Sequence, residues 1–360
     1  MKYIDEFRDK KLVTRLMTEI KKFRGRAAFM EVCGTHTMAI FRSGLRGLLG
    51  GRIALISGPG CPVCVTAQGD IDRMIALSHV KGMILTTFGD MLKVPGTNSS
   101  LEKERAAGAD IRIVYSPLDA LEIARATPRS EVAFLGVGFE TTSPAVASVI
   151  SDARAKKIKN FSVYSCHKVI PPAMRALLAA GEVRLDGFIC PGHVSTIIGT
   201  QAYDFICKDY RLPCVVTGFE PVDILESLLM LLQQVQRKQA TVAIQYKRAV
   251  KPEGNPLARA LLNKVFLPAD ADWRGMGIIP GSGLRLRAEF AAFDAARKFP
   301  ARVPRPKENP NCLCGKVLRG IKTPADCRLF AKACTPENPF GPCMVSTEGT
   351  CAAWYKYNRK

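Results

Sequence analysis

The sequence predicts an α/β protein with two parallel-sheet domains and a third domain that is rich in loops. Short β-rich runs alternate with helical runs from residue 27 to about residue 239, which is typical of parallel sheets. Unusual residues gather where these runs meet. After Tyr246 the character changes: Gly, Pro and irregular segments such as 275–283 and 300–310 dominate, and the chain ends in a Cys-rich tail. These observations separate two sheet domains from a different third one.

The alternation defines eight expected strands, which are residues 27–32, 53–57, 83–86, 111–115, 132–136, 161–165, 187–190 and 214–217. Helical patterns lie between them, for example at 71–79, 117–126, 145–158 and 221–239. Eight strands would also suit a TIM barrel. We prefer two Rossmann-like units of roughly four strands each, because a possible boundary falls near 127–131.

The expected domains are 26–128 and 129–240 for the two Rossmann-like units and 241–360 for the third domain. Residues 1–25 begin with a charged, amphipathic helical pattern, and we expect this helix to pack on the third domain. A short repeat supports two units, because Gly138-Phe139-Glu140 and Gly218-Phe219-Glu220 each follow a strand and precede a helix.

Composition limits the class of protein. The chain has 360 residues, 47% of them hydrophobic, and a net charge of +20 from 52 Lys and Arg against 32 Asp and Glu. The cations are scattered and no RNA-binding motif appears, so we expect an acidic protein partner or a small anion rather than nucleic acid. No apolar stretch is long enough for a signal peptide core or a membrane span, which predicts a cytoplasmic protein. Thirteen Cys in that compartment indicate metal binding or redox chemistry rather than a disulfide framework.

Chemically useful residues follow the expected strands at their carboxyl ends, where ligands bind in open α/β sheets. They are Cys33-Gly34-Thr35-His36, Gly58-Pro59-Gly60-Cys61-Pro62-Val63-Cys64, Phe88-Gly89-Asp90, Gly138-Phe139-Glu140-Thr141-Thr142 and Cys190-Pro191-Gly192-His193. Packing alone does not require such residues at every strand end.

Cys61 and Cys64 can chelate one soft metal ion or close a small disulfide ring. The following helix presents its positive end to them, which favours thiolates. The alternatives are a pair of buried thiols and a thioredoxin-like site, although the Trp-Cys context of the latter is missing. Cys33, in a neighbouring loop with His36, can join them at one site, and three thiolates would suit low-spin iron.

Other Cys and His residues carry weaker expectations. Cys166, His167 and His193 are further candidates for the metal site. Packing, hydrogen bonding or contact with a partner explains each of them more simply. Cys207 and Cys214 sit in apolar runs, and we expect both in the core.

The tail holds six Cys within about forty residues, at positions 312, 314, 327, 334, 343 and 351. Zinc would favour paired CxxC knuckles, which are absent, whereas irregular spacing suits a [4Fe–4S] cluster with four thiolate ligands. Two sulfurs would remain, for example as a redox pair beside the cluster. A tail held by zinc or by disulfides is the alternative.

These motifs together resemble the HypD family of [NiFe]-hydrogenase maturation factors over essentially the whole chain. The matching stretches are Glu31-Val-Cys-Gly-Thr-His-Thr37, Gly58-Pro-Gly-Cys-Pro-Val-Cys-Val-Thr66, Gly138-Phe-Glu-Thr-Thr-Ser-Pro144, Cys190-Pro-Gly-His-Val-Ser195 and Gly341-Pro-Cys-Met-Val-Ser-Thr-Glu-Gly-Thr-Cys351. The resemblance implies two Rossmann-like domains and a [4Fe–4S] domain. It also implies a complex with HypC that holds an iron carrying two cyanides and one carbon monoxide. HypE, with HypF upstream, would supply cyanide, and the hydrogenase large-subunit precursor would receive the iron centre.

The resemblance also implies roles for individual residues. Cys33 would bind the iron or form the site shared with HypC, and Cys61 and Cys64 would be a redox pair next to that iron. Cys327, Cys334, Cys343 and Cys351 would bind the cluster, although Cys312 and Cys314 could replace two of them. Thr35, His36 and Glu140 could exchange protons or hydrogen-bond cyanide nitrogens.

Two other functions share some of these features. A [4Fe–4S]-dependent thiol–disulfide reductase, similar in logic to ferredoxin–thioredoxin reductase, would need the cluster and the CxxC but no low-spin iron. A zinc-bound interaction protein would have no redox role.

Overall fold

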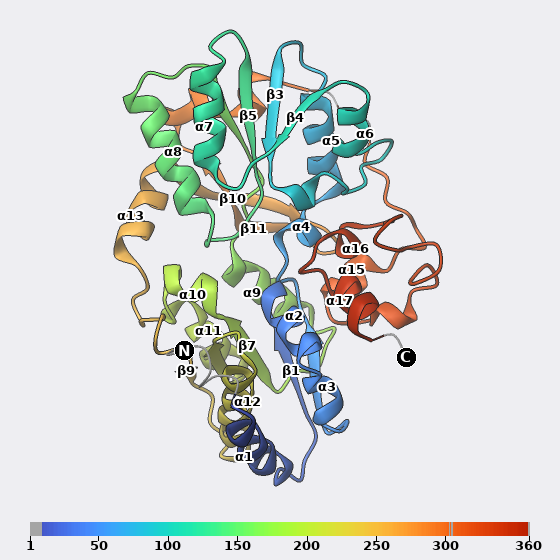
Figure 1. Ribbon diagram of the computed structural model, residues 1–360. Coiled ribbons are helices and arrows are strands. Elements are labelled where there is room, and N and C mark those ends of the chain that lie inside the picture. Colours follow the sequence, from blue (N-terminus) through green and yellow to red (C-terminus); the bar gives the residue numbers. More distant parts are fainter. Residues whose placement is uncertain (1–8, 302, 304, 359–360) are drawn as a thin grey trace.

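The computed structural model of the chain describes residues 9–301, 303 and 305–358. Two parallel sheets lie one above the other in the view of Figure 1, each covered by helices, and the Cys-rich C-terminal region lies beside their junction. The predicted α/β class with parallel sheets and a Cys-rich, loop-rich region is confirmed.

The first sheet has five parallel strands in the order β2 (Ile53–Ser57), β1 (Ala27–Glu31), β7 (Gly187–Pro191), β8 (Cys214–Thr217) and β9 (Val242–Ile244). The helices that connect these strands are α2 (Gly34–Arg42), α3 (Leu45–Leu48), α10 (Gly192–Ile198), α11 (Asp204–Tyr210) and α12 (Pro221–Gln236). The order reverses between β1 and β7, so their carboxyl ends form a topological switch point.

The second sheet has four parallel strands in the order β4 (Asp110–Ile113), β3 (Met83–Thr87), β5 (Glu131–Gly136) and β6 (Phe161–Ser165). Its helices are α5 (Gln68–Leu77), α6 (Leu101–Ala106), α7 (Pro117–Ala126) and α8 (Ser143–Ala155). Here the order reverses between β3 and β5, which gives a second switch point.

All eight expected strands form, but the expected boundary between 128 and 129 is wrong as a division of the sheets. β3 hydrogen-bonds with β5 across it, and the first sheet contains strands from both sides of the second. The chain leaves the first sheet after β2 and returns to it at β7, through α4 (Pro62–Val65) and α9 (Ile170–Ala180). Local sequence patterns identify strands but do not determine which strands pair, so the interleaving was not predictable from periodicity.

The N-terminal helix α1 (Lys10–Lys21) packs on α12. The expected packing of this helix on the C-terminal region is not found among the described residues. Leu16, Met17 and Ile20 share a buried core with Leu225 and Leu228 of α12. The apolar stripe of α12 is the partner that the amphipathic α1 requires.

The region expected to form the third domain is divided between the sheets and the Cys-rich tail. β9 belongs to the first sheet, and α13 (Pro256–Val265) packs on α8. Residues 275–283 were expected to be irregular, but most of them belong to β11 (Gly277–Leu286), which pairs antiparallel with β10 (Phe266–Trp273). Phe266 and Leu286 of this hairpin enter the core of the second sheet. A β-bulge in the hairpin and its high Gly content explain why alternation was hard to see.

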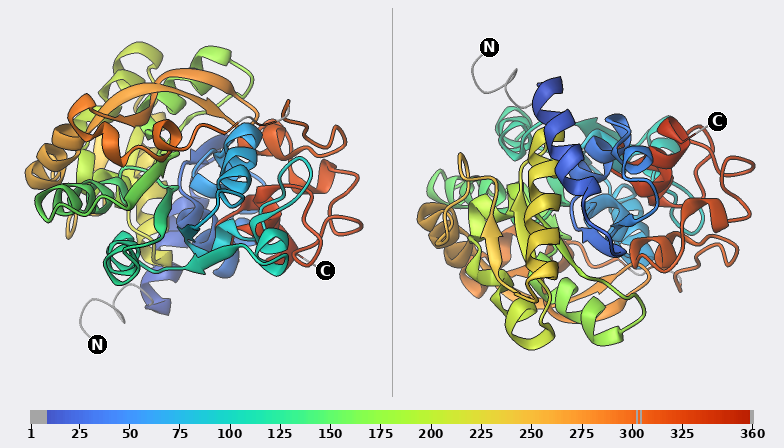
Figure 2. Two further views of the ribbon diagram at one scale, coloured as in Figure 1. Left: turned by 90° about the horizontal axis from the view of Figure 1, so that it is seen from above. Right: turned by 90° about the horizontal axis from the view of Figure 1, so that it is seen from below.

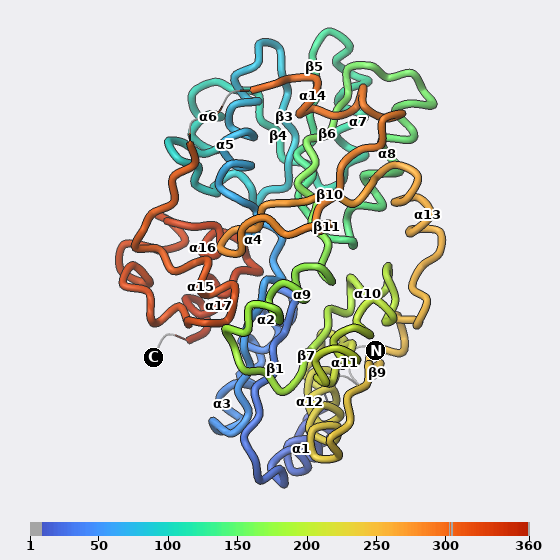
Figure 3. The backbone as a smooth tube through the Cα atoms, turned by 180° about the vertical axis from the view of Figure 1, so that it is seen from behind, coloured from blue at the N-terminus to red at the C-terminus, as the bar shows by residue number. Residues whose placement is uncertain are grey.

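The Cys-rich region proper, residues 305–358, contains only short helices: α15 (Cys314–Leu318), α16 (Pro342–Val345) and α17 (Thr350–Tyr357). α17 packs on α2 and α16 packs on α4, and both views of Figure 2 place this region beside the N-terminal segments. Seen from behind, the chain reaches it from α14 (Ala295–Lys298) at the second sheet (Figure 3). Within the described residues, no helix is both long and apolar enough to cross a membrane.

Candidate functional site

A cleft of about 390 Å³ lies where the switch points of the two sheets face each other. Its walls come from the loops after β1, β2, β3, β5 and β7 and from one segment of the Cys-rich region. Its lining includes Cys33, Thr35, Gly60, Pro62, Val63, Gly89, Asp90, Thr141, His193, Ser346 and Glu348. We call it the Cys33 cleft. Both switch points are sites where α/β proteins bind ligands.

Cys33 stands at the start of α2, directly after β1, and its backbone N–H donates to Glu31 Oε2 at 3.2 Å. The loop after β2 presses against it, because a Cβ on Gly60 would lie 2.2 Å from the Cys33 nitrogen. Burial, together with the charges of the Glu348 and Glu31 carboxyl groups, raises the pKa of the Cys33 thiol to about 12. Without a bound cation the group is therefore a thiol, and binding a soft metal would release its proton.

Cys61 and Cys64 form a disulfide across the start of α4, with 5.2 Å between their Cα atoms. The N–H of Cys64 donates to Cys61 Sγ at 3.1 Å, which is the capping bond of this short helix. Pro62 and Val63, between the two Cys, line the Cys33 cleft. On the other side, Cys64 Sγ lies 3.9 Å from the carbonyl oxygen of Pro342 in α16. The pair therefore lies between the cleft and the Cys-rich region.

All six Cys of the tail line one small cavity, which we call the six-thiol cavity: Cys312, Cys314, Cys327, Cys334, Cys343 and Cys351. Backbone N–H groups already point at two of the sulfurs, from Phe340 to Cys334 Sγ at 3.4 Å and from Cys351 to Cys343 Sγ at 3.3 Å. Hydrogen bonds of this kind tune iron–sulfur centres. Six convergent thiols fit the donor set of a [4Fe–4S] cluster.

The six thiols share one cavity, in which Cys343 lies within hydrogen-bonding reach of both Cys314 and Cys351. Among residues 9–301, 303 and 305–358, no three His, Cys, Asp or Glu side chains are arranged to hold a single metal ion. A cubane needs its four thiolates at separate corners of a larger body, whereas zinc needs them around one point. The choice of Cys327, Cys334, Cys343 and Cys351 as the four ligands stays a prediction, because all six thiols line the cavity.

Segment 346–348 of the Cys-rich region closes one side of the Cys33 cleft. Thr35 Oγ1 donates to Glu348 Oε1 at 2.6 Å, and Ser346 Oγ donates to Asp90 Oδ2 at 3.1 Å. Gly34 allows this approach, because a Cβ there would lie 2.4 Å from Glu348 Cβ. Burial, with the nearby Asp90 charge, raises the pKa of Glu348. The cleft is thus acidic beside its single thiol.

His36 and Glu140, predicted to act on protons or cyanide, do not line the cleft. His36 Nε2 lies 2.9 Å from the carbonyl oxygen of Gly218 and 3.2 Å from that of Thr217, so Nε2 carries the hydrogen. Burial lowers the pKa of His36 to about 4 and raises that of Glu140 to about 7. Glu140 Oε1 accepts the Ile170 N–H at 3.0 Å, which ties the loop after β5 to α9. Both residues position loops.

His193 is the imidazole that reaches the cleft, and it stacks on Phe219 at 3.8 Å between ring centroids. Cys166 and His167 are buried and lie outside the cleft lining. Cys207 and Cys214 are buried as expected. Glu31 and Glu348 belong to the site but were not predicted as site residues. The sequence contains a signal for each: Glu31 is an acidic residue at the end of a buried strand, and Glu348 is an acidic residue between two Cys of the tail.

Comparison with known proteins shows the family to which the chain belongs. Residues 9–358 match the family described as HypD, hydrogenase formation hypA family. A hydrogenase maturation factor HypD from Azotobacter vinelandii is 48% identical over 371 residues, which cover 100% of this chain and 98% of that protein. The Escherichia coli K12 hydrogenase maturation factor HypD is 42% identical, with 100% and 99% covered. A third, from Rhizobium leguminosarum, is 48% identical, with 100% and 96% covered.

Proposed function

The chain belongs to the HypD family of hydrogenase maturation proteins, and from this we propose that it is the scaffold on which the iron–cyanide–carbonyl group of [NiFe]-hydrogenases is assembled. In this proposal it works with HypC and accepts cyanide from HypE, with HypF acting before HypE. It then delivers the iron centre to the hydrogenase large-subunit precursor. The iron is cargo, not a resident cofactor. It would be held in the Cys33 cleft.

The observation that carries this proposal is the position of α4. Its central residues Pro62 and Val63 line the Cys33 cleft, while Cys64 Sγ lies 3.9 Å from α16, the helix that carries Cys343. A dithiol at this place can serve a metal in the cleft on one side and receive electrons from the six-thiol cavity on the other. A purely structural disulfide would not need either neighbour.

The cargo site matches the chemistry of the proposed ligand. Cys33 supplies one soft sulfur donor, and soft donors suit low-spin iron. The Cys61–Cys64 pair directly follows Gly60, which packs against the Cys33 backbone. His193 and Thr141 offer polar groups in the same lining, where cyanide nitrogens could accept hydrogen bonds. Holding Cys33 at a strand end, between glycine-dependent loops, fixes its position without cargo.

Cyanide transfer from a protein-bound thiocyanate needs two electrons. The S–C bond of the thiocyanate breaks to leave a thiolate and a cyanide anion. The Cys61 and Cys64 thiols supply the two electrons, lose two protons and form their S–S bond. Four of the six thiolates would hold a [4Fe–4S] cluster, which would supply electrons one at a time. Cys61 and Cys64 then take up two electrons and two protons to become thiols again.

Infrared spectroscopy of the purified complex with HypC tests the proposal. Metal-bound cyanide and carbon monoxide absorb where proteins do not, and we expect these bands in the unaltered protein. Cys33→Ser should abolish them while keeping the fold, because Cys33 stands in a cleft and not in a periodic apolar face. Cys166→Ser, at another buried thiol outside the cleft lining, is the matched control and should keep them.

Two results would contradict the assignment. Bands that persist in Cys33→Ser would remove Cys33 from the cargo site. A protein that never shows bands, yet reduces disulfides with its bound cluster, would be a [4Fe–4S]-dependent thiol–disulfide reductase instead.

A further inference from the structure

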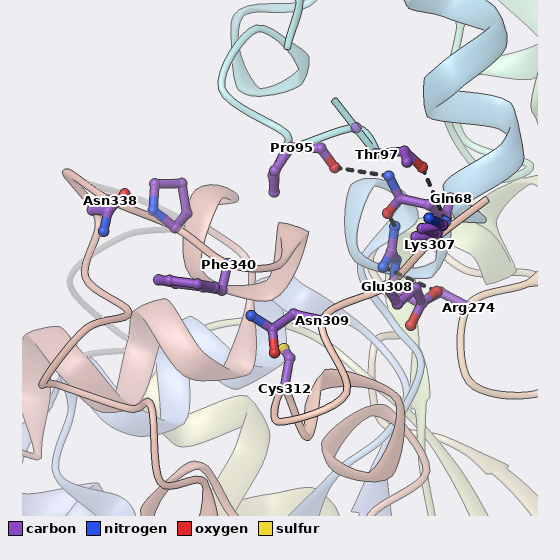
Figure 4. A pocket seen from close by; sticks show the side chains of 12 residues that line it. Gln68, Pro95, Thr97, Arg274, Lys307, Glu308, Asn309, Cys312, Asn338 and Phe340 are labelled. Atoms are coloured by element: carbon purple, nitrogen blue, oxygen red, sulfur yellow. Dashed lines mark hydrogen bonds and ion pairs between the residues drawn. The ribbon is translucent and has the colours of Figure 1, made fainter. Parts of the chain in front are cut away.

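A second cleft, also of about 390 Å³, opens beside the six-thiol cavity and shares no lining residue with the Cys33 cleft. Cys312 lines both this cleft and the six-thiol cavity. Figure 4 shows its sulfur beside Asn309 at the edge of the cleft, below Phe340. We call it the outer cleft. It connects the thiols to solvent by a route that is separate from the cargo site.

The walls of the outer cleft are held by bonds between distant segments (Figure 4). The Lys307 N–H donates to Thr97 Oγ1 at 3.0 Å, and Thr97 is itself bonded to Asp72 through both its N–H and its hydroxyl. Arg274, only 4% exposed, donates to Gln68 Oε1 at 2.7 Å and pairs with Glu308 at 3.1 Å. Segment 307–309 is therefore fixed, and a fixed surface loses little conformational freedom when a partner docks.

The Cys-rich region that surrounds this cleft is basic. Within 305–358, seven Lys and Arg are exposed against three exposed Asp and Glu. The cations are Arg305, Lys307, Lys316, Lys322, Arg328, Lys332 and Lys356, and the anions are Glu308, Asp326 and Glu337. The Cys33 cleft is the opposite, because Asp90 and Glu348 border it. An acidic partner would be attracted to the Cys-rich region and not to the cargo side.

The electron requirement narrows the class of partner, and this step rests on the proposed function. Reduction of the Cys61–Cys64 disulfide breaks one S–S bond and consumes two electrons and two protons. Electrons that pass by way of a [4Fe–4S] cluster arrive singly. The donor must therefore be able to release electrons one at a time. A one-electron carrier meets this requirement by docking twice for each disulfide, each time being oxidised by one electron, while solvent supplies the protons.

We propose that the outer cleft and the exposed cations around it are the docking surface for an acidic one-electron carrier protein, for which an acidic [2Fe–2S] ferredoxin is the probe. Lys307 lines the cleft, and Arg305 is an exposed residue two positions before it on segment 305–309, which leads directly to Cys312. The carrier binds by charge complementarity beside the thiol of the six-thiol cavity that lines this cleft. Electrons leave on the other side, through α16 and the Cys61–Cys64 pair.

Binding of an acidic [2Fe–2S] ferredoxin to the cluster-loaded protein tests this, with the dissociation constant measured at several salt concentrations. Arg305→Glu combined with Lys307→Glu should weaken binding about tenfold and flatten the salt dependence. The control is Arg237→Glu combined with Lys251→Glu, which makes the same charge change at exposed positions outside the Cys-rich region. It should change the dissociation constant by less than about twofold.

A second measurement separates docking from folding. With dithionite as reductant, the Arg305/Lys307 variant should expose the Cys61 and Cys64 thiols to a labelling reagent as fully as the unaltered protein. With reduced ferredoxin it should do so about tenfold more slowly.

Three outcomes would overturn the docking proposal: no binding of ferredoxin to the unaltered protein, equal weakening by the control pair, or unchanged binding by the Arg305/Lys307 pair. None of these affects the infrared bands, which test the scaffold function separately. If the bands are absent while ferredoxin docks as described, the scaffold proposal fails and the docking surface stands.

Discussion

The Cys33 cleft is built from loops at the ends of parallel strands, whereas the six-thiol cavity is built from short helices and turns. The cleft has one thiol, and its loops are held by sheet hydrogen bonds, by glycine-dependent contacts and by the buried Glu31. The cavity has six thiols, and no helix around it is longer than eight residues. The walls of the cleft are thus fixed by regular sheet structure, whereas the walls of the cavity are made of short segments with little regular structure between them.

This contrast fits two kinds of metal. A scaffold must release its cargo, so its site should keep its shape without the metal. A resident cluster can contribute to folding, because the thiolates it binds lie far apart in the sequence. The two regions nevertheless touch at α4 with α16 and at segment 346–348, so a change in one should be detectable in the other.

The largest expected effect is the loss of a cavity thiol. Cys343 is fully buried on α16, and Cys343→Ala should abolish the brown colour of the cluster and unfold much of 305–358, because metal binding and folding are coupled there. Iron and sulfide analysis, together with hydrogen exchange over that range, measures both effects. The same results are expected for alanine at Cys327, Cys334 and Cys351.

Changes at Cys312 and Cys314 should leave the colour. Buried Cys207 of the first-sheet domain, changed to Ala, is the control that should keep cluster and fold. A colourless Cys312→Ala or Cys314→Ala protein would change the set of ligands but not the presence of a cluster.

A somewhat smaller effect is expected at the preformed cleft. In Gly60→Ala the new Cβ would meet the Cys33 backbone at 2.2 to 2.4 Å, and backbone atoms cannot move aside cheaply. We expect a loss of roughly 3 kcal/mol of stability and of the iron–cyanide bands, while the cluster stays. Urea unfolding and infrared spectra are the measurements. Gly47→Ala, where a Cβ would meet nothing within 4 Å, should change neither.

The eight predicted strands and the Cys-rich region have local signals in the sequence, namely apolar β-rich runs and Cys spacing. The short β9 and the Gly-rich hairpin β10–β11 lack such a run and were not predicted. Strand order has no such signal: β7 joins β1 across more than a hundred residues, and only the folded chain shows this. The same holds for α1, whose amphipathic pattern predicted a helix but not its partner α12.

Within the site, it was easier to predict which residue types take part than to predict where their side chains point. Cys33, Cys61 and Cys64 lie on neighbouring loops, as their strand-end positions had indicated. His36 follows Cys33 by three residues on α2, yet its ring turns to the backbone of Thr217 and Gly218 in another loop. Which face of α2 meets the cleft is fixed by the packing of β8 and α17, and the Cys33 motif contains no information about these elements.

The buried carboxyl group of Glu140 should make stability depend on pH. Its pKa is about 7 in the fold, raised by burial above the ordinary 4.5. The folded protein therefore holds this proton more tightly than the unfolded chain, and stability is lost as pH rises from about 4.5 through about 7. Glu140→Gln keeps an acceptor for the Ile170 N–H and should be more stable than the unaltered protein at pH 8 by about 1–3 kcal/mol.

Urea unfolding at pH 5 and pH 8 measures this difference, which should fall to about a quarter of its pH 8 value at the lower pH. The exposed Glu122, changed to Gln, should leave the pH dependence as it is. A Glu140→Gln protein with the full pH dependence would show that another group is responsible.

The smallest expected effect concerns the bond that joins the two regions. Thr35 on the cleft side donates to Glu348 of the Cys-rich region at 2.6 Å, and Thr35→Val removes the donor while keeping the shape of the side chain. Because this bond is only partly buried, its loss should cost about 1 kcal/mol, with roughly fivefold faster hydrogen exchange at the amides of 346–348. Thr127→Val removes a hydroxyl bonded to the Ile123 carbonyl of α7 and should leave those amides unchanged.

If segment 346–348 closes the cleft, Thr35→Val should also release bound iron faster without loss of the cluster. Unchanged exchange in Thr35→Val would mean that the close approach at Gly34 and the Ser346–Asp90 bond hold the two regions together without it.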